Sequence, residues 1–173
     1  INIGDEYLGK DRKLGFWRDT CLRLEGDAVY SLQRVFLEDW KLVSDKMPDE
    51  FSTLFPPNKI APGEAVLIVK SGPDMSSNPI LETVFSACVS ASERIYIATP
   101  YFIPDNSLEM ALKTSALAGV DVRIIIPGIA DSRLTLWATL SYAEEMLRSG
   151  VRIYRYQKGF IHAKTIVVDR HFS

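Results

Sequence analysis

Three residues near the end of the sequence combine types and a spacing that suit phosphoryl chemistry. His162 and Lys164 are separated by one residue, and Asp169 follows five positions later. Alternate side chains of an extended segment share one face, so we expect His162 and Lys164 to lie side by side. An imidazole with an ordinary pKa near ~6.5 can act as nucleophile or as general acid and base at neutral pH. An ammonium group beside it can hold a phosphate oxygen and stabilise developing charge.

The surroundings of this pair also predict a site. Burying a lysine without a partner is unfavourable, so the face carrying both side chains is expected to be a pocket that receives an anion. Asp169 has the opposite parity to His162 and comes at the end of the apolar run, so we expect it to orient or brace the site. The alternative is a surface strand on which a histidine and a lysine fall together by accident.

The elements that must position these residues follow from the hydrophobic pattern after Glu64. Asn106, three residues before Glu109, predicts a capping box at the start of a helix, and Gly119 predicts its end. Short β-branched runs alternate with helical periodicity, which predicts an α/β layer with a mixed, mostly parallel sheet flanked by helices and right-handed crossovers. The short connection at 157–160 allows the last two strands to form an antiparallel hairpin. The predicted strands are 65–70, 94–99, 120–126, 151–156 and 161–168, and the predicted helices are 79–92, 106–119 and about 132–150.

The first third of the chain has a different character. Residues 1–26 indicate a loop followed by a short strand at 20–24, and Asp27 is placed to cap a helix over 28–40. The prolines within 41–63 make a helix or a central strand there unlikely, so this segment is interpreted as a linker.

Composition excludes several classes of protein. The chain has 173 residues, 47% of them apolar and 24% charged, with a formal net charge of −2. It lacks the excess of basic residues that nucleic-acid-binding proteins usually carry, so no nucleic-acid partner is expected. Cys21 and Cys88 form no metal-binding pattern with the two histidines and are expected to be reduced thiols. No carboxylate cluster suited to Mg²⁺ is evident, no cofactor is expected, and no run is long enough to span a bilayer.

The pattern H-x-K-x-x-x-x-D at 162–169 is the motif of the phospholipase D superfamily. Further segments resemble bacterial cardiolipin synthases over essentially the whole chain: 1–7, 16–20, 98–105 and 150–154. In that family one protein carries two such motifs, one in each lobe. The resemblance implies that residues 1–40 are the end of a first phospholipase D-like lobe and that 64–173 are a second lobe. This lobe is expected to be truncated at its C-terminus, because the Gly-Ser/Thr-x-Asn element expected after the second motif is missing where the chain stops at Ser173.

The resemblance also implies a reaction, namely the joining of two phosphatidylglycerol molecules into cardiolipin with release of glycerol. One motif's histidine forms a phosphohistidine, and the other histidine protonates the leaving alcohol and deprotonates the incoming one. The first motif usually supplies the nucleophile, so His162 is expected to be the general acid and base. The implied partners are a phospholipid substrate, the first lobe of the same protein and, through that protein, a bacterial membrane with the catalytic part on its cytoplasmic side.

Three further residues are candidates for substrate binding. Asn2 resembles the asparagine that follows the first motif in the family. Tyr101 and Phe102 come after a predicted parallel strand, at the edge where open α/β sheets bind ligands. For the second pair a packed turn is the equally plausible alternative.

Other readings remain open at this point. The protein can be a phospholipase or a nuclease of the same superfamily, although a nuclease should show a basic groove. From another class, the chain can be a non-catalytic piece that folds or associates, since it carries one His–Lys pair where the reaction needs two. A nucleotide-binding domain is disfavoured, because neither of the usual glycine-rich phosphate motifs is present.

Overall fold

The computed structural model describes residues 2–48, 51–57, 63–170 and 172. The chain divides into two compact units, of which one comprises Ile1–Cys21 with Leu81–Ser173 and the other Leu22–Ile80. The first unit contains all of the predicted site residues. Among the described residues, no helix has the length and apolar character needed to cross a membrane.

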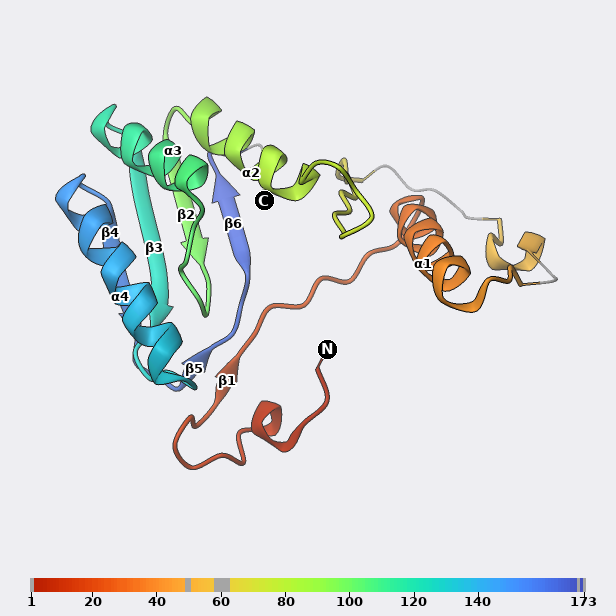
Figure 1. Ribbon diagram of the computed structural model, residues 1–173, viewed down its shortest axis with the longest axis horizontal. Helices are drawn as coiled ribbons and strands as arrows, with labels where there is room; N and C mark the ends of the chain where they lie inside the picture. Colours follow the sequence, from red (N-terminus) through yellow and green to blue (C-terminus); the bar gives the residue numbers. More distant parts are fainter. Residues whose placement is uncertain (1, 49–50, 58–62, 171, 173) are drawn as a thin grey trace. The chain divides into compact units, whose positions relative to one another are not determined.

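A four-stranded sheet forms the centre of the first unit, with the strand order β4-β3-β2-β6 (Figure 1). The pairs β2–β3 and β3–β4 are parallel, and β6 lies antiparallel to β2 at the other edge. The predicted mixed, mostly parallel sheet is therefore confirmed. Its strands are β2 (Arg94–Ala98), β3 (Asp121–Pro127), β4 (Arg152–Tyr156) and β6 (Thr165–Val168).

Helices cover one face of this sheet because alternate strand residues are apolar. Ile95, Ile124 and Val168 belong to that face and are buried in one hydrophobic cluster. Apolar side chains of three helices, among them Leu112 and Met146, fill the same cluster. The three helices are α2 (Pro79–Ser90), α3 (Asn106–Leu117) and α4 (Arg133–Arg148).

The start of α3 differs by one residue from the predicted capping box. Asp105 is the N-cap, and its carboxylate accepts a hydrogen bond of 2.9 Å from the backbone N–H of Leu108. Asn106 is already helical, and the Glu109 side chain instead pairs with Lys113 one turn later. Aspartate and asparagine are N-cap residues of similar quality, so Asp105 can take the N-cap position that the sequence pattern assigned to Asn106.

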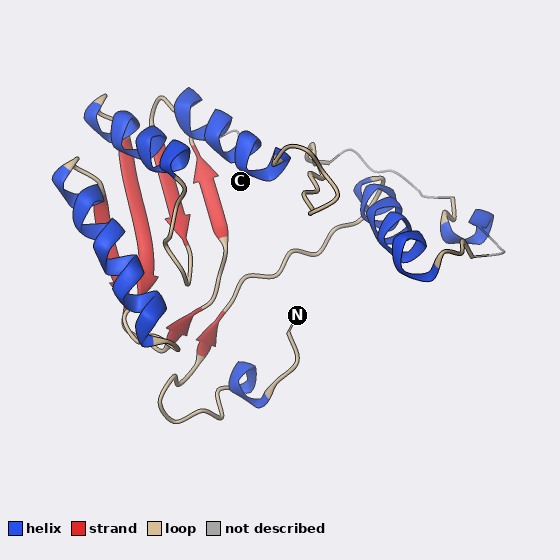
Figure 2. Cartoon of the chain, viewed as in Figure 1, coloured by secondary structure: helices blue, strands red, loops and turns tan. Residues whose placement is uncertain are grey.

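The end of the chain does not form the hairpin that the short connection allowed. After β4 the chain leaves that edge of the sheet and forms β5 (Phe160–Ile161), which pairs in parallel with β1 (Trp17–Arg18) (Figure 2). It then joins the opposite edge as β6. The predicted strand 161–168 is thus two strands that serve two sheets, and residues 162–164 between them carry the candidate site.

The predicted strand at 20–24 is also wrong, because these residues are irregular and the strand is the earlier β1. A strand of two residues is too short to show an alternating pattern of apolar side chains. β1 forms because β5 pairs with it, and the local sequence does not reveal that distant partner.

The second unit contains α1 (Ala28–Ser44) and the short 3-10 helix η2 (Phe51–Leu54). The helix predicted over 28–40 is present and runs one turn further, ending at Asp45 with a positive φ of 54°. Part of the predicted linker, 49–50 and 58–62, lies outside the described residues. The predicted strand at 65–70 is wrong, because these residues are irregular and no described strand pairs with them.

Candidate active site

The backbone of His162 is fixed by the two-stranded pairing of β1 and β5. The backbone N–H groups of Phe160 and His162 donate to the carbonyls of Phe16 and Arg18, at 3.0 and 2.8 Å. Gly159 precedes this segment with a φ of 116°, and a Cβ added there would lie 2.1 Å from the Phe16 carbonyl oxygen. Only glycine allows this approach, so the turn before His162 depends on Gly159.

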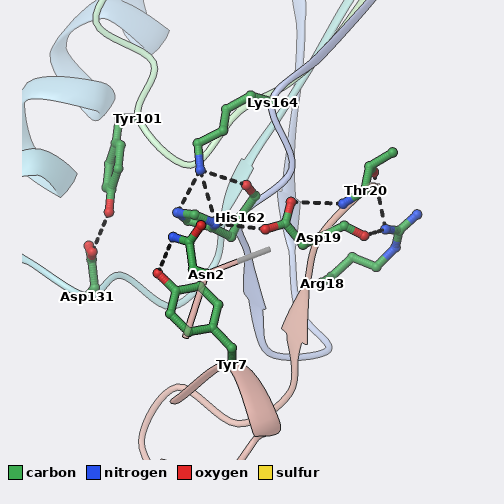
Figure 3. A network of polar contacts seen from close by, with 9 residues as sticks. All are labelled: Asn2, Tyr7, Arg18, Asp19, Thr20, Tyr101, Asp131, His162 and Lys164. Carbon is green, nitrogen blue, oxygen red and sulfur yellow. Dashed lines mark hydrogen bonds and ion pairs between the residues drawn. The ribbon is translucent and has the colours of Figure 1, made fainter. Parts of the chain in front are cut away.

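The imidazole of His162 lies between an ammonium and a carboxylate (Figure 3). The Nζ atom of Lys164 is 2.6 Å from Nε2 of His162 and 3.0 Å from its carbonyl oxygen. Nδ1 of His162 is 3.0 Å from Oδ2 of Asp19 and also 3.0 Å from Nζ of Lys164. The structure therefore brings His162 and Lys164 together, although they do not lie within one continuous strand.

These contacts define how the imidazole is used. A carboxylate only accepts hydrogen bonds, so Nδ1 carries the hydrogen that Asp19 receives, and Nε2 is the nitrogen that can release and take up a proton. The His162 side chain is 11% exposed. These contacts hold the ring of the largely buried side chain in one orientation, with Nε2 next to the Lys164 ammonium group.

Two charged groups next to the His162 ring, Asp19 and Lys164, have shifted pKa values. Partial burial on its own raises the pKa of Asp19, but hydrogen bonds from His162 and from the Thr20 backbone outweigh it, and the pKa is lowered. Burial lowers the pKa of Lys164, and the charge of Asp19 acts in the opposite direction. Asp19 thus stays ionised beside two groups that carry or can take a proton.

Aromatic rings form the wall of the site around His162. The Trp17 ring lies 5.0 Å from the imidazole centroid, and the Tyr7 ring meets it nearly edge-on at 5.8 Å. Asn2 donates a 2.6 Å hydrogen bond to the hydroxyl of Tyr7. The structure thereby places Asn2 beside the His162 site, as Figure 3 shows.

The two neighbouring candidates Tyr101 and Phe102 point in different directions. Tyr101 is 38% exposed, and its hydroxyl donates to Asp131 at 2.5 Å. Phe102 is 4% exposed and packs in the hydrophobic cluster of the sheet. Tyr101 is available to a ligand in this structure, and the Phe102 side chain is part of the core.

Asp169 binds the backbone at the far end of β6. Its carboxylate accepts hydrogen bonds of 2.8–2.9 Å from the backbone N–H groups of Ser92, Glu93 and Arg94. These bonds, the one from Arg94 first, hold the pKa of Asp169 far below its ordinary value. Its φ of 52° turns the chain at this point. Asp169 fastens the end of β6 to the start of β2.

Asp19 is the functional residue that the sequence reasoning missed. It lies 143 positions from His162, and an aspartate in a polar loop gives no local signal. The available hint was the segment 16–20, whose resemblance to the family covers this residue. Within the described part of the chain, no group of three or more histidine, cysteine or acidic side chains is placed to hold a metal ion.

The fold and the site together define an α/β domain that presents a His–Lys pair for phosphoryl chemistry. A family model described as "Cardiolipin synthase, PLD-like domain" matches residues 85–173. The chain belongs to this family.

Similar proteins agree with that assignment. The chain is 47% identical to a "Cardiolipin synthase 2" of Bacillus anthracis over 98% of its own length and 33% of the relative's. It is 44% identical to a "Cardiolipin synthase" of Geobacillus thermodenitrificans, over 98% of its length and 34% of that relative. The chain thus spans about a third of the curated relatives it matches. A solved structure of the phospholipase D family member Nuc from Salmonella typhimurium is 26% identical, with a TM-score of 0.45 over 53% of this chain and 58% of that one.

Proposed function

We propose that this chain supplies one of the two His–Lys pairs of a phosphatidyltransferase, within a longer bacterial protein of its relatives' length. The reaction is the formation of cardiolipin from two phosphatidylglycerol molecules at the membrane. The observation that carries the proposal is the His162 imidazole, fixed between the Asp19 carboxylate and the Lys164 ammonium. A lobe preceding this chain supplies the second pair.

In the first step, the histidine of the other lobe attacks the phosphorus of one phosphatidylglycerol. A P–N bond forms, the P–O bond to glycerol breaks, and His162 donates a proton from Nε2 to the leaving oxygen. In the second step, Nε2 takes the proton of an incoming headgroup hydroxyl, which attacks the phosphohistidine and breaks the P–N bond. Positioned proton transfer of this kind contributes roughly 10²–10⁴-fold to a rate.

The other candidate residues take supporting roles in this proposal. Lys164 holds a nonbridging phosphate oxygen, Asn2 and Tyr101 face the substrate, and Asp169 keeps β6 in place. Phe102 acts from the core, by positioning the loop that carries Tyr101. No metal takes part in these steps, since the histidines and Lys164 supply the nucleophile, the proton and the positive charge.

The direct test uses the longer protein with phosphatidylglycerol vesicles and follows cardiolipin and glycerol. We expect equimolar products, and we expect His162→Ala to abolish them. Phosphatidic acid as the only lipid product would identify a phospholipase instead. An unchanged rate in His162→Ala would remove this residue from the mechanism and favour a non-catalytic role for the chain.

A second assay separates the roles of the two histidines. A phosphatidyl ester of p-nitrophenol needs little acid assistance, because its leaving group is stable as an anion. If His162 is the general acid, His162→Ala should still release a burst of p-nitrophenol with this substrate. Absence of the burst would assign His162 as the nucleophile.

The charge of Lys164 can be tested apart from its effect on the fold. We expect Lys164→Ala to lower the transfer rate roughly 10²–10³-fold, as the loss of one charge-stabilising donor does in other enzymes. Because the side chain is exposed, the melting temperature should hardly change. Global unfolding of this variant would show that Lys164 is structural.

A further inference from the structure

A hydrogen-bonded pair, Tyr101 and Asp131, lies at the same edge of the sheet as the His–Lys pair, and the part of the substrate that it contacts has not been specified above. The hydroxyl of Tyr101 donates to Oδ2 of Asp131 at 2.5 Å. Tyr101 follows β2 and Asp131 follows β3, and these two strands are parallel neighbours. Both side chains are solvent-accessible, so a ligand can reach them.

Both loops are fastened to the fold. The backbone N–H of Phe102 donates to the buried hydroxyl of Thr139 at 3.2 Å, which holds the Tyr101 loop against α4. The backbone N–H of Gly128 donates to the Tyr156 carbonyl at 2.9 Å, and Arg155 donates to the Gly128 carbonyl at 3.0 Å. The Tyr–Asp pair is therefore presented by fixed loops rather than by a chance surface contact.

The strand register places this pair beside the reaction centre. Ala98, the last residue of β2, is opposite Thr165, the first residue of β6, in the antiparallel pairing. Thr99 and Lys164 therefore lie just beyond this end of the two strands, and Tyr101 comes two residues after Thr99. From the other side, the Tyr7 ring packs edge-on against the His162 ring. Figure 3 shows Tyr101 and Asp131 across from His162 and Lys164.

The free atoms of the pair are all hydrogen-bond acceptors. Burial, together with the neighbouring Asp131 carboxylate, raises the pKa of Tyr101 to about 12, so its hydroxyl keeps its proton at neutral pH. That proton is already donated to Asp131, which leaves a lone pair on the tyrosine oxygen and the second carboxylate oxygen, Oδ1. Two adjacent acceptors fit a ligand with two adjacent hydroxyl donors.

We propose that Tyr101 and Asp131 bind the neighbouring hydroxyl groups of the incoming polyol headgroup and select a vicinal diol as the acceptor. This inference rests on the proposed phosphatidyl transfer and names the part of the site that chooses the acceptor. One hydroxyl of the diol attacks the phosphohistidine, and the other is held by the pair. A monohydric alcohol lacks the second hydroxyl, so it leaves one acceptor of the pair without a donor.

The experiment measures acceptor choice in the longer protein. Phosphatidylglycerol vesicles are incubated with equal concentrations of 1,2-propanediol and 1-propanol, and the two phosphatidyl products are quantified. We expect the wild-type protein to favour the diol. Asp131→Asn replaces an acceptor by an amide donor and should lower the diol-to-propanol ratio roughly tenfold.

Two further variants make the result interpretable. Tyr101→Phe removes the other acceptor and should lower the same ratio even if Asp131→Asn fails to fold. Asp105→Asn removes a carboxylate from the adjacent loop but retains an N-cap residue of equal quality, and its ratio should equal that of wild type.

Three outcomes would overturn the inference. An unchanged ratio in folded Asp131→Asn and Tyr101→Phe would show that the pair does not contact the acceptor. An equal fall in both products would place the pair at the leaving headgroup. A wild-type preference for ethanolamine over the diol, lost in Asp131→Asn, would identify a cation subsite. Absence of transfer to any alcohol by the wild-type protein would instead remove the proposed function itself.

Discussion

At the scale of single residues, the orientation of one imidazole depends on Asp19. Its carboxylate receives the Nδ1 hydrogen of His162 and leaves Nε2 basic. Asp19→Asn keeps the shape but presents an amide that can stabilise the opposite tautomer. We therefore expect the rate of transfer to fall roughly 10- to 100-fold, the usual effect of removing a residue that orients a reacting histidine.

A purely structural role for Asp19 would give a different result. The control is Asp39→Asn on the exposed surface of α1, which should leave the rate unchanged. A lower melting temperature with an unaltered rate per folded molecule would contradict the positioning role.

Asp169 leads to a prediction about stability and pH. Its folded-state pKa lies below the ordinary value near ~3.9, because backbone N–H groups bind the ionised form. The stability from these bonds is therefore fully present above the unfolded-state pKa and is lost as the pH falls through the folded-state value. Asp169→Asn should lower the melting temperature by several degrees at pH 7.

The difference between this variant and wild type should shrink as the pH is lowered below about 4, since the unfolded wild-type chain then binds a proton at Asp169 that the folded protein takes up only at a lower pH. Thermal unfolding of both proteins between pH 3 and 7 tests this. Asp74→Asn, in the other unit, is the matched control. A constant difference across this range would show that the backbone bonds of Asp169 are not linked to its ionisation.

The sequence reveals part of the site at this scale. The spacing of His162 and Lys164 was enough to predict that they lie together, because residues two positions apart on an extended chain share a face. Asp19 and Asp131 were not found, since each meets its partner through the fold: Asp19 through β1–β5 pairing and Asp131 through adjacent parallel strands.

At the scale of elements, the loop that carries Tyr101 depends on α4. The buried hydroxyl of Thr139 accepts from the Phe102 backbone N–H. Thr139→Val keeps the volume but leaves this N–H without its partner, which costs about 1–3 kcal/mol in a buried position. We expect the free energy of unfolding to fall by that amount in urea denaturation, and the rate of transfer to fall as the loop loses its attachment.

Thr114→Val on the exposed side of α3 is the matched control and should change stability by less than about 0.5 kcal/mol. If both variants are equally stable, the contact between Phe102 and Thr139 does not fix the loop.

Most elements of the first unit could be predicted from hydrophobic periodicity. The strands β2 and β3 bury alternate residues, and the buried residues of α3 and α4 recur three to four positions apart. The pattern failed where an element depends on a distant partner. The run at 65–70 has strand character but no described partner, and 161–168 has the pattern of one strand although two sheets share it.

At the scale of the whole molecule, α1 carries an apolar surface that its own unit does not cover. Five large apolar side chains recur along one stripe of the helix and are exposed: Val29, Leu32, Phe36, Trp40 and Val43. Their spacing of three and four residues is that of a helix face that packs against another surface. A continuous exposed apolar stripe marks an interaction site in a soluble protein.

This stripe predicts self-association of the isolated chain. At micromolar concentrations we expect sedimentation velocity to show species larger than a monomer. Phe36→Glu places a charge at the centre of the stripe and should shift the distribution to monomer without lowering the melting temperature, because Phe36 is exposed. Ser31→Glu adds the same charge off the stripe and should leave the association unchanged. In the longer protein, whose other lobe can cover α1, we expect Phe36→Glu to destabilise instead, since the charge would then be buried. A monomeric wild-type chain, or equal effects of both variants, would mean that the stripe does not drive association.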